Sequence, residues 1–204
     1  MRPKLKISNL ISLQDARSSA AVGFDFIGFN LIRGANQKVS VSMAWNIIQW
    51  LSGPEIVLEL DKASMPELED AANTFEFPHV SLPWEDWSPG TDLKGKDVIL
   101  RGDHSLTPDQ VGTLLEQMES LGVSGLIELS LPGIAEVKAY KPHLGHCLIH
   151  LPQLEMVEDL IRENDLIPGG LSFYDEVQEE PGVLDYERID EFLELFEEVF
   201  EEED

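Results

Sequence analysis

Short apolar runs alternate along the whole chain with longer amphipathic segments. Apolar runs of about 4–8 residues between turn signals are typical of buried strands, whereas apolar residues three and four positions apart are typical of helices. The strand pattern occurs in eight segments, at residues 5–10, 24–32, 55–61, 79–83, 97–103, 124–130, 146–152 and 169–175. Because strands separated by helices cannot pair as hairpins, the pattern predicts a parallel sheet covered by helices.

Eight strand–helix units in 204 residues predict one small (β/α)8 barrel, with residues 1–204 as a single domain. An open doubly wound sheet is the alternative, but that fold usually has a glycine-rich first turn. The first turn here reads "SNLISLQD" and contains no glycine. At the other end of the chain, apolar residues at helical spacing among many acids predict an acidic helix over residues 185–202.

The charge is strongly negative, with 14 Lys and Arg against 39 Asp and Glu, for a net charge of −25. Such a field repels nucleic acid and anionic membranes, so we expect neither as a partner and expect instead a basic protein partner. Cys147 is the only cysteine, which excludes an intrachain disulfide. No apolar run approaches the roughly 18 residues of a membrane helix, and no signal peptide is recognisable, so a cytoplasmic protein is expected.

In (β/α)8 barrels the active site lies at the carboxyl ends of the strands. We therefore expect a small-molecule ligand at that end. The polar residues at the predicted strand ends are Ser8, Asn9, Asn30, Arg33, Glu59, Asp61, Ser81, Arg101, Asp103, His104, Glu128, Ser130, His150, Asp175 and Glu176. Roughly half of such residues only cap helices or lie on the rim, because strand ends are where loops become polar.

Three stretches resemble one enzyme family. "KISNLISLQDARSSAAVGFDFIGFNL" is similar to the opening of phosphoribosylanthranilate isomerase, with its Lys-Ile-Cys-Gly strand, Asp-Ala helix start and Gly-Phe strand. "KVSVSMAWNI" and "EEPGVLDYERIDEF" resemble later segments of the same family. The resemblance implies a (β/α)8 barrel and an Amadori rearrangement of a sugar phosphate in tryptophan biosynthesis, without a cofactor.

The family's catalytic positions differ in this chain. The resemblance places Ser8 where the family has a cysteine base, and Glu128 where it has an aspartate acid. A serine hydroxyl keeps its proton near neutral pH, so it cannot simply replace a thiolate. Acidic residues crowd the turn after the eighth predicted strand, where the resemblance implies phosphate binding, and Gln37 occupies the place of a basic residue.

These departures predict a barrel of this family whose isomerase activity is lost or altered. The first alternative is a divergent but active isomerase. The second is a barrel enzyme with a His/carboxylate site, built from Arg101, Asp103, His104, Glu128 and His150. Such side chains could bind a divalent metal, but no His-x-His motif supports this, and we predict no metal site.

If the chain is an enzyme, each candidate has an expected role. Glu128 is the proton donor, and His104 or His150 is the replacement base, since an ordinary histidine accepts protons near neutral pH. Ser8 is also a catalytic candidate, because it stands at the position of the family's base. Together with Asn9 it is expected to line the floor of the pocket. The predicted substrate-binding residues are Asn9, Arg33, Arg101 and Asp175.

Overall fold

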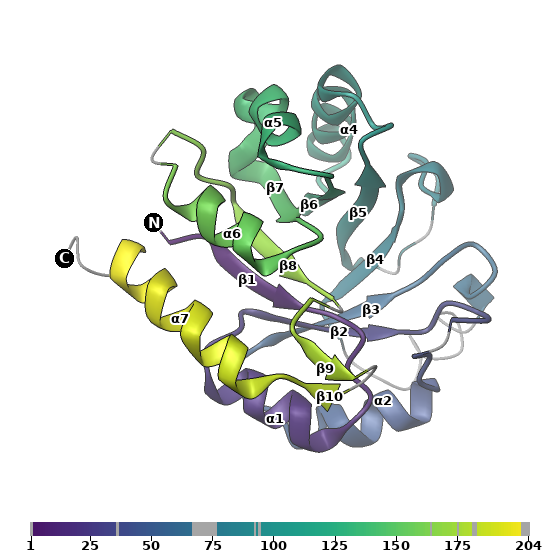
Figure 1. The fold of residues 1–204 in the computed structure, drawn as a ribbon. Helices are drawn as coiled ribbons and strands as arrows, with labels where there is room; N and C mark the ends of the chain where they lie inside the picture. Colours follow the sequence, from purple (N-terminus) through teal and green to yellow (C-terminus); the bar gives the residue numbers. More distant parts are fainter. Residues whose placement is uncertain are drawn as a thin grey trace.

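The structure is a computed structural model that describes residues 2–35, 37–66, 77–91, 93, 95–163, 165–174, 176–180 and 183–200. Eight parallel strands close a barrel in which β8 pairs with β1 (Figure 1). The strands are β1 Lys4–Ile7, β2 Phe26–Asn30, β3 Glu55–Glu59, β4 His79–Pro83, β5 Asp97–Asp103, β6 Gly125–Ser130, β7 Cys147–His150 and β8 Gly170–Phe173. The predicted (β/α)8 barrel is confirmed, and closure of the sheet excludes the doubly wound alternative.

Helices follow most of the strands and cover the outside of the barrel (Figure 1). They are α1 Leu13–Ala21, α2 Val41–Ile48, η1 Trp84–Asp86, α4 Pro108–Ser120, α5 Ile134–Val137, η2 Lys138–His146, α6 Leu154–Ile161 and α7 Tyr186–Phe200. Local signals explain their starts: Ser12 caps α1, and Thr107 forms a capping box with Gln110 at α4. None of the helices in the described ranges is long and apolar enough to cross a bilayer.

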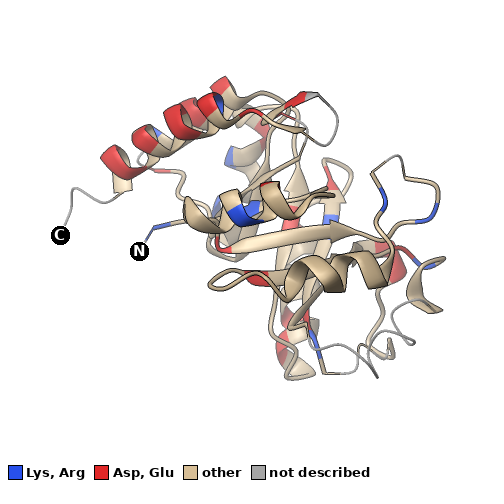
Figure 2. Ribbon diagram, turned by 90° about the horizontal axis from the view of Figure 1, so that it is seen from below, with Lys and Arg blue, Asp and Glu red and all other residues tan. Residues whose placement is uncertain are grey.

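The closing helix α7 matches the predicted acidic helix, within the part of it that the structure describes. Its apolar face, formed by Ile189, Phe192, Leu193 and Phe196, is buried. Its acidic residues lie along the outside of the molecule, as Figure 2 shows. Before it, a short antiparallel pair that the sequence did not predict, β9 Gln178–Glu180 and β10 Val183–Leu184, extends the loop after β8.

Side chains two positions apart on one strand share the inner face of the barrel. This period places two groups of polar residues at opposite ends of the interior. Lys4, Glu55, His79 and Asp97 are the first residues of their strands. The second group, which includes Lys6, Glu59 and Glu128, lies toward the carboxyl ends, and an apolar cluster is formed inside by Phe26, Val57, Ile99 and Leu148.

The single cysteine lies in β7. Cys147 is completely buried, and burial raises the pKa of its thiol to about 12. Because the thiolate is the reactive form, we expect no reaction of the folded protein with a disulfide reagent at about pH 8, and one reacting thiol per chain after denaturation. Absorbance of the released thiol chromophore measures both. Prompt labelling of the folded protein would contradict this burial.

Candidate functional site

A fully buried lysine organises the carboxyl end of the barrel interior. Lys6, on β1, has no exposed surface. Its ammonium donates hydrogen bonds to Ser8 Oγ at 2.5 Å and to Glu59 Oε1 at 2.7 Å. It also lies 3.1 Å from Glu128 Oε2, so one ammonium faces two carboxylates from strands β3 and β6.

Glu128 is held by hydroxyl groups as well as by the lysine. Its Oε1 accepts a hydrogen bond from Ser172 Oγ and another from Tyr174 Oη, each at 2.5 Å. The Glu128 side chain is 2% exposed. Hydrogen bonds donated to a carboxylate favour its ionised form.

The ionisation of the buried pair follows from these contacts. Burial alone would lower the pKa of Lys6, but the carboxylates of Glu128 and Glu59 override this and raise it above its ordinary value. Burial alone would raise the pKa of Glu128, but the Lys6 ammonium, with the hydroxyls of Ser172 and Tyr174, holds it below its ordinary value. Lys6 and Glu128 therefore form an ammonium–carboxylate pair at neutral pH.

Ser8 lies between Lys6 and Glu59 with its hydroxyl fully engaged. Ser8 Oγ donates to Glu59 Oε1 at 2.6 Å while accepting from Lys6. A glycine makes room for this contact: a Cβ at Gly28 would lie 2.8 Å from Glu59 Oε1 and 2.9 Å from Ser8 Oγ. The neighbouring strand therefore approaches the two side chains too closely for any larger residue without displacing them.

Two further groups border this network. The Arg101 guanidinium donates to the carbonyl of Leu60 at 2.5 Å and lies 3.8 Å from Glu59 Oε2. The Tyr174 phenol keeps its proton, because burial and the Glu128 carboxylate raise its pKa well above the ordinary value. The network as a whole thus contains two carboxylates, one ammonium and one guanidinium, with hydroxyls filling the gaps.

A second set of contacts surrounds His150 beside this network. The Ser130 hydroxyl lies 3.0 Å from His150 Nδ1, and Glu176 Oε2 lies 3.4 Å from Nε2. The imidazole also meets the Tyr174 ring edge-on, with centroids 4.9 Å apart. Contacts at both ring nitrogens thus hold His150 in place. Its ring also contacts Tyr174, which donates a hydrogen bond to Glu128.

Three of the four remaining predicted site residues, Asn9, Arg33 and His104, lie in the described part of the chain. Asn9, with a left-handed φ of 62°, accepts a hydrogen bond from Asn30 Nδ2 at 3.0 Å. Arg33 and His104 are exposed in the turns after β2 and β5. Asp175 lies outside the described residues. The catalytic and substrate-binding roles expected for all these residues stay predictions. The small-molecule ligand at the carboxyl end of the barrel and the basic protein partner stay predictions as well.

Three members of the network were missed from the sequence: Lys6, Ser172 and Tyr174. A usable signal existed for Lys6, because the period of two places it on the same face as Ser8. Candidates were sought among the last residues of each strand and the loops that follow. Lys6 and Ser172 were missed because they lie within their strands. Within the described ranges, no group of three or more His, Cys, Asp or Glu side chains is placed to hold a metal ion.

Comparison with known proteins gives sequence matches to two phosphoribosylanthranilate isomerases and many structural matches. No protein-family model matches the chain. A phosphoribosylanthranilate isomerase of Leptospira interrogans is 29% identical over 89 residues, which are 42% of this chain and 42% of that protein. The match therefore spans less than half the length of this curated relative.

Solved structures share the whole fold. A phosphoribosylanthranilate isomerase in complex with reduced 1-(o-carboxyphenylamino)-1-deoxyribulose 5-phosphate superposes with a TM-score of 0.76 at 18% identity, covering 96% of this chain and 99% of that one. The enzyme from Pyrococcus furiosus gives 0.76 at 16% identity, covering 97% and 100%. At such identities these structures establish the fold alone.

Proposed function

We propose, from the premise that this chain is a divergent member of the phosphoribosylanthranilate isomerase family, that it has kept the barrel and lost the Amadori rearrangement. The observation that carries the proposal is the state of Glu128, the residue at the family's acid position. Lys6, Ser172 and Tyr174 hold it as a carboxylate. Its place in the family pattern alone does not fix this state, because a carboxyl group there could be protonated or ionised.

The acid step requires a proton where Glu128 has none. Opening the ribose ring needs a group that donates a proton to the ring oxygen, and a general acid works best when its pKa lies near the operating pH. The contacts of Glu128 move its pKa away from neutrality, below the ordinary glutamate value. Lys6 is an equally poor donor, because its two carboxylates raise its pKa.

The base step lacks a suitable group at the expected place. Ser8 has one neighbour that could take its proton, the Glu59 carboxylate, 2.6 Å away. A carboxylate is far too weak a base to remove a proton from an alcohol, and Glu59 is itself paired with Lys6. Ser8 therefore serves to connect the two charged residues, and does not abstract a carbon-bound proton.

The turn after β8 also opposes a phosphate group. Glu176 is turned back toward the barrel, where its Oε1 accepts from the Tyr174 backbone N–H at 3.0 Å. Its other oxygen faces His150. A carboxylate in this position repels an anion that would approach the backbone amides of the turn. The proposed role that remains for the carboxyl end of the barrel is binding of a small molecule without isomerisation.

A fluorescence assay with N-(5′-phosphoribosyl)anthranilate tests the proposal. We expect no turnover above the buffer rate, because neither Glu128 nor Ser8 is competent for the proton transfer expected at its position. The Pyrococcus furiosus enzyme, assayed in the same buffer, is the positive control. Turnover by this chain that disappears in Glu128→Gln, while the variant stays folded by circular dichroism, would overturn the proposal and establish the active-isomerase alternative.

A further inference from the structure

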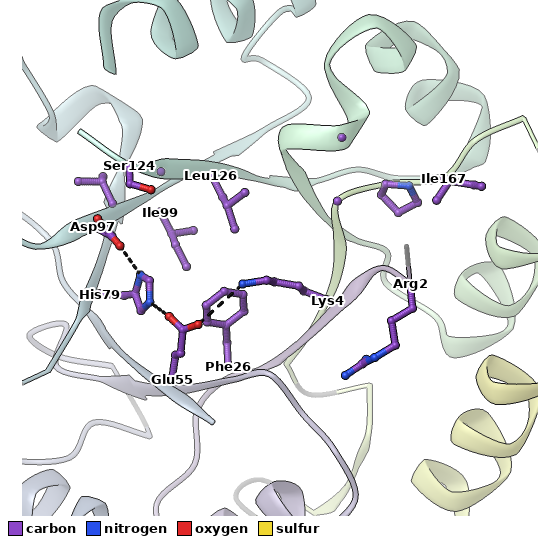
Figure 3. Close-up of a pocket in the computed structure, with 15 residues that line it drawn as sticks. Arg2, Lys4, Phe26, Glu55, His79, Asp97, Ile99, Ser124, Leu126 and Ile167 are labelled. Carbon is purple, nitrogen blue, oxygen red and sulfur yellow. Dashed lines mark hydrogen bonds and ion pairs between the residues drawn. The ribbon is translucent and has the colours of Figure 1, made fainter. Parts of the chain in front are cut away.

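A pocket of about 530 Å³ opens at the amino-terminal end of the barrel, opposite the site described above (Figure 3). Its polar wall is formed by the first residues of four strands: Lys4, Glu55, His79 and Asp97. The apolar cluster of Phe26, Val57, Ile99 and Leu148 lies in the barrel interior, and two of its members, Phe26 and Ile99, line the pocket. The pocket is therefore a site separate from the Lys6 network.

The polar wall is a row of alternating groups, as the dashed lines in Figure 3 show. Lys4 Nζ lies 3.8 Å from Glu55 Oε1, and the other Glu55 oxygen contacts His79 Nε2. His79 Nδ1 lies 4.0 Å from Asp97 Oδ2. The imidazole is nearly buried, with 10% of its side chain exposed, whereas Glu55 and Asp97 are 47% and 46% exposed. Both carboxylates can therefore reach a molecule in the pocket.

Much of the remaining lining is apolar. Phe26, which contacts Lys4 and His79, and Ile99 are buried, and Leu126 and the half-exposed Ile167 continue this apolar surface. One cation already uses this surface, because the Lys4 ammonium lies 4.6 Å from the centroid of the Phe26 ring. A cation over an aromatic face is attracted by the electron density of the ring. The pocket thus combines the two surfaces that an amphipathic cation needs.

The balance of charge favours a cation over an anion. Arg2, which also borders the pocket, is occupied by Asp25, whose carboxylate accepts from its guanidinium at 3.1 Å. Glu55 is likewise occupied by Lys4 and His79, whereas Asp97 Oδ2 lies 4.0 Å from His79 Nδ1, so Asp97 is the less engaged carboxylate. The net charge of −25 on the chain adds a long-range field of the same sign.

A metal ion does not fit this arrangement. The two nitrogens of the His79 ring face different carboxylates, so the ligand atoms point to opposite sides of the imidazole and not toward one centre. We infer that the pocket binds a small organic cation, a primary amine carried on an alkyl or aryl body. The ammonium pairs with Asp97, while the body packs on Ile99, Leu126 and Ile167.

Titration with 2-phenylethylamine, followed by amide chemical shifts in NMR spectra, tests this inference. Saturable shifts are expected at Ser124, Leu126 and Ile167, with a dissociation constant in the millimolar range. The neutral isostere 2-phenylethanol and the anion phenylacetate should bind more weakly or not at all. Equal binding of the anion, or shifts confined to the carboxyl end of the barrel, would overturn the inference.

Variants separate the pocket from general attraction to an acidic protein. Asp97→Asn should weaken amine binding about fivefold, near the upper limit for a half-exposed ion pair, whereas Glu55→Gln should weaken it less, because the Glu55 carboxylate already faces Lys4 and His79. Asp190→Asn, which removes an exposed acid from α7, is the matched control and should leave the affinity unchanged. Equal affinity in all three variants would show that the amine responds only to net charge and would refute the site. Thermal unfolding of each variant confirms that it is folded.

Discussion

Lys6→Met is expected to lower the free energy of unfolding by about 3–5 kcal/mol, because it leaves two buried carboxylates without their cation. Glu59 and Glu128 would then face each other across the space that the ammonium occupies, with hydroxyl groups and the more distant Arg101 guanidinium to stabilise them. For a chain of this size the loss corresponds to a fall in Tm of roughly 10 °C. Urea unfolding followed by circular dichroism measures the change.

The chain offers a matched control two residues earlier on the same strand. Lys4→Met removes a lysine whose side chain is 48% exposed and whose ion pair with Glu55 is 3.8 Å long. Exposed pairs of this kind contribute about 0–1 kcal/mol, so this variant should unfold close to the parent. If Lys6→Met were as stable as Lys4→Met, the buried network would not have the energetic role assigned to it.

Glu128→Gln is expected to lower the free energy of unfolding by about 2–3 kcal/mol at neutral pH, and the loss should disappear in acid. The loss is smaller than for Lys6→Met because Lys6 keeps Glu59 as a partner. The pKa of Glu128 is below its ordinary value of 4.5 in the folded protein. Its contribution is therefore present above pH 4.5 and is lost as the pH falls through the lower folded value.

Lys6 sets the upper limit of the pH range in which the ion pair stabilises the fold. The pKa of Lys6 is raised above its ordinary value of 10.5, so its contribution is complete below that pH and is lost only as the pH rises through the folded value. Urea unfolding of parent and Glu128→Gln across the acid range gives the difference directly. Glu197→Gln on the exposed face of α7 is the control. A difference between parent and Glu128→Gln that persists unchanged into strong acid would contradict the ion pair.

The barrel itself could be predicted from the sequence because its signals are local. Most strands are short apolar runs followed by a helix, and some of these helices have a recognisable start, as at Thr107. Strand ends were less certain: residues 24–32 were predicted where β2 is Phe26–Asn30. The β9–β10 pair was missed because β9 carries only polar residues and β10 is only two residues long.

The site was harder to predict because its residues come into contact only when the eight strands close into a barrel. Glu59 and Glu128 lie 53 and 122 positions from Lys6 along the chain, and both contact its ammonium. The period of two places all three on the inner face, but it does not say which inward side chains meet across the barrel. The ionisation of Glu128 depends on that meeting, so a carboxyl group at the family's acid position was compatible with either protonation state.

The apolar cluster of Phe26, Val57, Ile99 and Leu148 has a consequence for how such a barrel can change over evolutionary time. It separates the polar groups of one end from those of the other, because no chain of polar side chains crosses it among the residues described here. Substitutions that abolish a reaction at one opening need not disturb recognition at the opposite one. A descendant can therefore lose its ancestral chemistry while a second, unrelated binding activity is retained under selection.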